Sequence, residues 1–367
     1  MRKLLQILFR KPIALLASRL SSKPEQKNVF SSLSKLLKAI RNGHKKKGLI
    51  LSMNHEADRF IILSDQHKGT RDEADDFRGA EQNYLAALEY YYVQGFFFVS
   101  LGDCEELWKN MAQDVMKKNE TCFAAEKKFL DNDRYYRVFG NHDLAWKYRL
   151  QQDLFLQPVF GKKIRVYEGL ILETSYQDNR YSLFLTHGHQ GDLRGAGSPF
   201  SIWVVANIWT PIQRYLHISI NTPATSFTLT DKHNILMYEW SAKQNNLVFI
   251  SGHTHKPVFA SLDHIERLTR QLETARQTGD VNGMASIEAE LKKRKEEYAG
   301  KQQIRGMAKP SYFNSGCCCF EDGDITGIEI AEGHIRLVKW DNKQGAVQRT
   351  VLEEALLADV FQEISDG

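Results

Sequence analysis

The chain has 367 residues, of which 42% are hydrophobic and 26% are charged, and its formal net charge is +4. This composition is typical of a packed globular protein, and the length suits one large domain with insertions or two modest ones. It excludes a disordered chain, a collagen-like fibre and a protein that crosses the membrane many times.

Charge is distributed unevenly along the chain. Residues 1–48 hold 13 Lys and Arg against one acid, Glu25, which leaves 36 basic and 44 acidic residues for the rest. The apolar stretches 4–9 and 12–17 are interrupted by basic residues and are too short to span a bilayer. We expect this basic amphipathic arm to lie on an anionic membrane surface; a solvated tail and a mitochondrial transit peptide are the alternatives.

The remainder of the chain is acidic, which disfavours an extended phosphate-tracking surface, so no nucleic-acid partner is expected. The five cysteines give no disulfide framework and no CxxC spacing, as expected in a reducing compartment. No clean signal-peptide cleavage site follows the first apolar stretches. These features predict a cytoplasmic protein, peripheral on the inner face of the membrane, and they favour no particular oligomeric state.

Short apolar runs, each followed by a polar cluster, begin near residue 60. Runs of four to six residues rich in Phe, Ile, Val and Tyr indicate buried strands. The five runs are 60–64, 96–100, 135–139, 183–185 and 247–250, and strand character resumes at 312–315, 325–330 and 335–340. A helix is expected over 80–93, between the first two runs. This alternation of strand and helix predicts an α/β layered domain.

Two stretches have the composition of insertions. Residues 194–240 are unusually apolar and aromatic, which predicts a helical cap, and residues 263–302 are charged with Leu and Ile at helical spacing. Gly-Asp and Asn-Gly pairs near residue 280 break the second stretch and predict a helical hairpin. We therefore expect an arm over 1–48, a domain over 58–342 containing both insertions, and a tail over 343–367.

The polar clusters that follow the five runs hold most of the residues able to bind a metal. In α/β sheets, ligands bind outside the carboxyl ends of the strands, so clusters far apart in sequence can converge on one point. The clusters are Ser64-Asp65-Gln66-His67, Gly102-Asp103-Cys104-Glu105-Glu106, Gly140-Asn141-His142-Asp143, Thr186-His187-Gly188-His189 and Gly252-His253-Thr254-His255. Each cluster alone is weak evidence, but five in this order indicate a metal site.

This set of motifs resembles the calcineurin-like metallophosphoesterase superfamily, whose pattern is DxH, GDxx(D/E), GNH(D/E), a His before Gly, and GHxH. The resemblance implies a four-layer αββα sandwich and two divalent metal ions. It implies that Asp65, His67, Asp103 and His255 bind one ion, and that Asp103, Asn141, His187 and His253 bind the other. His142 is implied to be the general acid, oriented by Asp143.

The chemistry of these residues agrees with that implication. Mixed imidazole nitrogens and carboxylate or amide oxygens suit borderline ions, so Mn²⁺ is expected, with Fe²⁺ and Zn²⁺ as alternatives. Two ions lower the pKa of a water and hold phosphoryl oxygens for in-line attack. Glu106, at the acidic position of the second motif, is expected to be a partner of a ligand. Lys68, Arg71 and His189 are candidate substrate contacts, with a solvated loop or a hydrogen-bonded turn as the alternatives.

The motifs indicate the chemistry more closely than the substrate. A phosphate ester or pyrophosphate is expected, lipid-linked if the apolar cap covers the site, as in the UDP-diacylglucosamine hydrolases. The chain departs from that group at His142, where an Arg would be expected. A cyclic-nucleotide phosphodiesterase and a protein phosphatase are alternatives. A scaffold that uses the same fold is the non-enzymatic alternative, although such proteins lose ligands that this chain retains.

Overall fold

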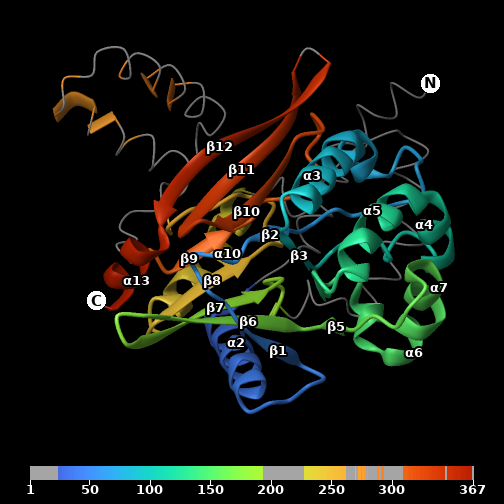
Figure 1. Ribbon diagram of the computed structural model, residues 1–367, viewed down its shortest axis with the longest axis horizontal. Coiled ribbons are helices and arrows are strands. Elements are labelled where there is room, and N and C mark those ends of the chain that lie inside the picture. Colours follow the sequence, from blue (N-terminus) through green and yellow to red (C-terminus); the bar gives the residue numbers. More distant parts are fainter. Residues whose placement is uncertain are drawn as a thin grey trace.

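A computed structural model gives the structure of residues 24–192, 227–261, 309–343 and 345–365, and of single positions between 269 and 292. Two β-sheets form its centre (Figure 1). The seven-stranded sheet has the order β12-β11-β10-β2-β3-β4-β5 and the five-stranded sheet the order β1-β6-β7-β8-β9. Every strand predicted from the sequence is present.

The seven-stranded sheet combines a parallel and an antiparallel half. Its parallel strands are β2 (Phe60–Leu63), β3 (Phe97–Leu101), β4 (Tyr135–Val138) and β5 (Val166–Tyr167). The antiparallel strands are β10 (Ile325–Ala331), β11 (His334–Lys343) and β12 (Ala346–Leu356). The five-stranded sheet contains β1 (Gly48–Ser52), β6 (Gly169–Tyr176), β7 (Asn179–Thr186), β8 (Leu247–Ser251) and β9 (Tyr312–Asn314).

The two sheets pack face to face over a shared apolar core. Leu170 and Leu172 of β6 belong to this core together with Ile62 of β2 and Val99 of β3. The preceding residue of β2, Ile61, belongs to a different core on the outer face of its sheet. Because successive strand residues point to opposite faces, a strand covered on both sides must be apolar throughout, as the Phe-Ile-Ile-Leu of β2 is.

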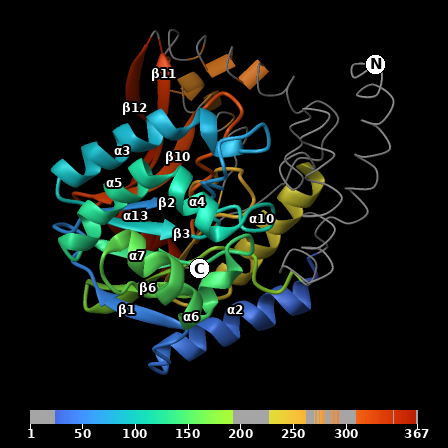
Figure 2. The same ribbon diagram turned by 90° about the vertical axis from the view of Figure 1, so that its right-hand side faces the viewer.

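Helices cover both outer faces of the sandwich. α3 (Glu81–Val93) and α5 (Glu120–Asp131) pack on the seven-stranded sheet, and α2 (Gln26–Arg41) and α10 (Phe227–Ser241) pack on the five-stranded sheet. Figures 1 and 2 show α3 and α2 on opposite sides of the strands. Shorter elements beside α5 are α4 (Ala112–Lys118), α6 (Arg149–Gln151), α7 (Gln157–Phe160), η1 (Asp76–Gly79), η2 (Leu144–Lys147) and η3 (Gln152–Leu156). The predicted four-layer αββα arrangement is confirmed.

The sandwich extends beyond the predicted domain of residues 58–342. β12 pairs with β11 along its whole length, and α13 (Leu357–Ser365) buries Leu357, Val360, Phe361 and Ile364 in the core between the sheets. At the other end of the chain, β1 pairs with β6. Residues 345–365 are therefore part of the sheet and its core rather than a tail.

The second half of the predicted arm is α2, whose apolar face packs on the five-stranded sheet. Val29, Leu33, Leu36, Leu37 and Ile40 are buried there. This face is therefore occupied by the protein's own core, and only the polar face of α2 is exposed. Residues 1–23 lie outside the described part of the chain. Within the described part, no helix has the length and apolar character needed to cross a bilayer.

The predicted insertions are described only in part. Residues 194–226 of the predicted cap lie outside the described residues, whereas its last part is α10, which belongs to the outer layer. In the predicted hairpin, Leu272 and Leu291 are buried against each other. Arg276 Nη2 lies 3.1 Å from Glu288 Oε1 between the same two segments. These contacts agree with two antiparallel helices, and the hairpin stays a prediction.

Replacing Phe361 by Ala should lower the free energy of unfolding by roughly 3–5 kcal/mol, because truncating a fully buried aromatic ring leaves a cavity. The Phe361 ring is fully buried and stacks on Tyr181, with ring centroids 4.4 Å apart. Gln362→Ala, at the exposed neighbouring position, is the matched control and should change stability by less than about 0.5 kcal/mol. Equal urea denaturation curves for the two variants would show that α13 is not part of the folded domain.

Candidate metal centre

The five polar clusters all follow strands at their carboxyl ends. β2, β3 and β4 run parallel in one sheet, and β7 and β8 run parallel in the other. Loops after parallel strands meet at one edge of a sheet, and here the edges of both sheets meet. The loops are joined to one another, since Asp65 N donates to Gly102 O (3.0 Å) and Gly252 N donates to His187 O (3.0 Å). The predicted convergence of the clusters is thus present.

Asp65 uses its two carboxylate oxygens for different purposes. Oδ2 accepts a hydrogen bond from His253 N (2.9 Å), which fixes the loop after β8 against the loop after β2. Oδ1 lies 3.2 Å from His255 Nε2 and 3.9 Å from both His67 Nε2 and His187 Nε2. Burial would raise the pKa of Asp65, but His187 and His255 outweigh burial and lower the pKa to about 2. The carboxylate therefore stays ionised.

Asp103 is used in the same divided way. Its Oδ1 accepts from His142 N (2.7 Å), and its Oδ2 lies 3.1 Å from His187 Nε2 and 3.7 Å from His67 Nε2. Gly140 is required beside it, because a Cβ on that residue would lie 2.1 Å from Asp103 Oδ1. Asp103 thus connects the loops after β3 and β4 while one oxygen faces the histidines.

Three histidines are held so that Nε2 faces the two aspartates. His187 Nδ1 donates to Leu101 O (3.0 Å), and His67 Nδ1 lies 3.2 Å from Glu106 Oε2. His255 Nδ1 contacts Cys319 Sγ at 3.8 Å. The Nε2 atoms of His67 and His255 are then only 3.3 Å apart. A second hydrogen-bonded nitrogen fixes the ring orientation of a metal-binding histidine in this way.

Several of these residues have unusual backbone conformations. The φ angles of Asp65, His67, Asp103, His253 and His255 lie between 50° and 69°, in the left-handed region that non-glycine residues rarely adopt. Each such residue costs about 1–3 kcal/mol and persists only where its surroundings impose the conformation, and such residues cluster at functional sites. Five of the candidate ligands, all in loops that follow strands, have this conformation.

The residues present fit a pair of divalent ions. Ligands about 2.1 Å from one ion lie roughly 3–4 Å from each other, as the oxygens and nitrogens around Asp65 and Asp103 do. Asp103, His187 and His253 offer atoms within 4.8 Å of one another, as do His67, Asp103 and His142. Asn141 Oδ1 is buried and has no hydrogen-bond partner among the described residues. Mixed nitrogen and oxygen donors suit borderline divalent ions.

His142 is oriented by Glu106 and not by Asp143. Nδ1 of His142 lies 2.9 Å from both carboxylate oxygens of Glu106, and its ring stacks on Trp108 with centroids 4.1 Å apart. Asp143 instead accepts from Gly140 N (2.6 Å) and Cys104 N (2.9 Å), and its carboxylate shares no hydrogen bond or ion pair with the His142 ring. The expected Asp143 role is therefore wrong, because its carboxylate binds backbone amides of two loops.

Lys68 is not available to a substrate. Its ammonium group is fully buried, 2.6 Å from Glu126 Oε1 and 3.5 Å from Glu105 Oε1. Arg137 pairs with the same Glu105 carboxylate, and both carboxylates accept further bonds from buried tyrosine or tryptophan side chains. Lys68 follows the candidate ligand His67 directly. The prediction that Lys68 contacts substrate is wrong, and its ion pairs hold the loop of His67 against the protein core.

The two other predicted substrate contacts differ from each other. Arg71 Nη2 lies 2.5 Å from Glu81 Oε1, and its guanidinium group covers the Phe77 ring. Arg71 therefore pairs with the start of α3 and does not face the metal centre. His189 is buried with its ring centroid 5.4 Å from that of His187. Burial, together with the nearby His187, lowers the pKa of His189 to about 3, so this ring is neutral. The structure brings His189 to the centre and leaves Arg71 outside it.

Sequence reasoning assigned no role to four residues that lie at the centre. Cys319 contacts His255, Trp108 stacks on His142, and Asp192 and His233 gather with His253. Trp108 Nε1 also donates to Asn141 O (2.7 Å). None of these four residues directly follows one of the five runs, so no strand-end signal pointed to them.

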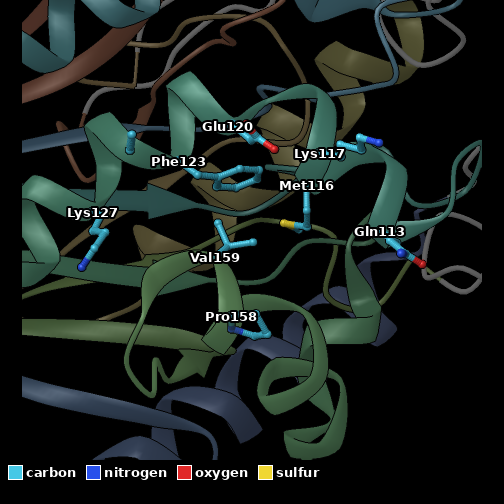
Figure 3. Close-up of a pocket in the computed structure, with 9 residues that line it drawn as sticks. Gln113, Met116, Lys117, Glu120, Phe123, Lys127, Pro158 and Val159 are labelled. Carbon is cyan, nitrogen blue, oxygen red and sulfur yellow. The ribbon is translucent and has the colours of Figure 1, made fainter.

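A separate hollow lies between α4, α5 and α7 (Figure 3). Its volume is about 420 Å³, and Met116, Phe123, Pro158 and Val159 form its apolar lining. The lining includes no candidate metal ligand. This hollow is therefore distinct from the metal centre.

Comparison with known proteins identifies one family. The family model described as calcineurin-like phosphoesterase matches residues 58–257. Vacuolar protein sorting 29 from Cryptosporidium parvum is similar with a TM-score of 0.34 and 12% identity, over 82% of this chain and 98% of that one. A single mutant of Vps29 from Entamoeba histolytica gives a TM-score of 0.31 and 11% identity, over 80% and 99%. These similarities are too low to indicate a function. No curated protein matches the chain.

Replacing Lys68 by Met should lower the free energy of unfolding by roughly 3–5 kcal/mol, because buried carboxylates lose their cation. Adding Glu126→Gln should recover part of that loss, since one unpaired charge is then removed. The matched control is Lys117→Met, at an exposed position, which should leave urea denaturation nearly unchanged. If Lys68→Met has the stability of the control, Lys68 does not have the structural role assigned to it.

Proposed function

Because the chain belongs to the calcineurin-like phosphoesterase family, we propose that it is a metal-dependent phosphoesterase. One observation carries this proposal. Asp65 Oδ1 and Asp103 Oδ2 face the ring nitrogens of His67, His187 and His255 at distances of 3.1 to 3.9 Å. A scaffold would not need this convergence, which places strained residues and buried charges at one point.

We assign the ligands to two ions as the family resemblance implies. Asp65, His67, Asp103 and His255 hold the first ion, and Asp103, Asn141, His187 and His253 hold the second. When bound, the two ions supply positive charge that polarises the phosphoryl group and activates the attacking water. Mn²⁺ is the proposed ion, since borderline divalent ions match these donors.

His142 is proposed to protonate the leaving group. Its Nδ1 faces Glu106, so Nε2 is the ring nitrogen available to carry the proton to a leaving oxygen. Burial would lower the pKa of His142, but the carboxylates of Glu106 and Asp103 outweigh burial and raise the pKa above its ordinary value. This direction of shift favours the imidazolium form, as a general acid requires.

The substrate is proposed only as a class, a phosphate ester or a pyrophosphate. The UDP-diacylglucosamine type, a cyclic nucleotide and a phosphoprotein remain candidates, and a scaffold is the non-enzymatic one. A screen of the Mn²⁺-loaded protein against bis-p-nitrophenyl phosphate, p-nitrophenyl phosphate, nucleotide sugars and UDP-lipids separates diester, monoester and pyrophosphate hydrolysis. Two bound ions without hydrolysis of any of these would favour the scaffold.

Chelation should abolish hydrolysis of bis-p-nitrophenyl phosphate, and Mn²⁺ should restore it at least as well as Mg²⁺. Asp103→Asn should lower kcat by at least about 10²-fold, because the charge that two ions supply is worth several kcal/mol. Asp322→Asn, at an exposed position, is the matched control and should behave as the wild type. A wild-type rate in metal-free protein, with metal content measured by elemental analysis, would exclude the two-ion mechanism.

Glu106→Gln should move the alkaline limb of the pH–rate profile to lower pH, measured at saturating Mn²⁺. The sign follows from the charge: a general acid works when protonated, and removing the carboxylate lowers the pKa of His142. Exposed Glu321→Gln is the control. An alkaline limb that does not move in Glu106→Gln would remove His142 from this role.

His142→Ala should lower kcat by roughly 10²–10⁴-fold while metal content stays the same, with a smaller loss for good leaving groups.

A further inference from the structure

A second group of metal-binding side chains lies beside the proposed pair of ions. Asp192, His233 and His253 offer a carboxylate oxygen and two ring nitrogens that all lie within 4.8 Å of one another. The three residues come from different segments, namely the loop after β7, helix α10 and the loop after β8. None of the two-ion assignments uses Asp192 or His233.

The geometry of this group is that of ligands around one position. His233 Nε2 lies 3.6 Å from Asp192 Oδ2, a separation that ligands sharing an ion about 2.1 Å away would have. The rings of His233 and His253 meet edge to face, with centroids 5.2 Å apart and an interplanar angle of 77°. The ring nitrogens of His233 and His253 and the Asp192 carboxylate are therefore close together, although the two rings do not stack.

Burial makes the group unlike a surface cluster. Asp192 is fully buried, and His233 and His253 are 3% and 6% exposed. Placing a carboxylate and two imidazoles together away from water is costly unless hydrogen bonds or a bound ion use their lone pairs. An ion bound by two histidines and one carboxylate uses them and keeps open positions for water or an anionic ligand.

We propose that Asp192, His233 and His253 form a binding position for a third divalent cation. The donor set selects a borderline ion such as Zn²⁺ or Mn²⁺ over Ca²⁺, which requires more oxygens. His253 also lies in the group with Asp103 and His187, and serving both positions at once would require its imidazolate form, with the ring N–H proton released to solvent. The third ion would add positive charge beside the second ion, and that consequence alone rests on the proposed function.

The number of bound ions tests this proposal without any assay of activity. The full-length protein is stripped with EDTA, dialysed to equilibrium against Mn²⁺ or Zn²⁺, and its metal content is measured by elemental analysis. We expect about three ions per chain in the wild type and about two in His233→Gln and in Asp192→Asn. The matched control His334→Gln, which pairs with Glu354 on β12, should keep about three.

Thermal denaturation of each variant in EDTA identifies any variant that does not fold. The test needs only one of the two variants to be folded. A wild-type content of about two ions would overturn the proposal, as would variants that keep about three. A wild type with two ions whose content falls further in His233→Gln would also overturn it, because His233 would then serve the second ion. Since no substrate is present, failure of hydrolysis and failure of the third position are distinguished.

Discussion

Two aspartate carboxylates determine the arrangement of the metal centre. Asp65 and Asp103 each give one oxygen to a backbone amide of another ligand loop, those of His253 and His142 respectively. The remaining oxygen of each faces the histidine nitrogens. Each carboxylate therefore fixes a neighbouring loop with one oxygen and leaves the other oxygen for the proposed metal ion. Gly140 and Gly252 are needed for this, since a Cβ at either would lie within 2.4 Å of a carboxylate oxygen.

A buried network of charged side chains stabilises the strained ligand loops. Lys68 and Glu105 follow the candidate ligands His67 and Asp103 closely, and they pair below the centre with Glu126 and Arg137. Removing one member of a buried charge network is costly because the others lose their compensation. Below this network, the core of α3, α5 and the seven-stranded sheet holds the strand ends in place. Stability of the sandwich and position of the ligands are therefore coupled.

The sequence predicted most of the side chains that gather at the candidate metal centre, because each of those predicted follows a run of buried strand residues. It could not show which of several nearby carboxylates faces His142: Glu106 and Asp143 are both near in sequence, and only the turn of each loop decides between them. Lys68 was misassigned because a basic residue beside a ligand has the same pattern whether it is buried or exposed. β12 was missed since its side chains alternate without a buried face, and it pairs only with β11. By contrast, α13 carries a readable helical pattern at Leu357, Val360, Phe361 and Ile364.

The central claim is that Asp103 lies between two ions at the carboxyl ends of both sheets. The most direct measurement is anomalous X-ray scattering from crystals of the protein grown with Mn²⁺. The account predicts two peaks about 4 Å apart on either side of the Asp103 carboxylate, one beside His67 and His255 and the other beside His187. Crystals that contain Mn²⁺ without a peak at Asp103, or with only one peak there, would contradict the account.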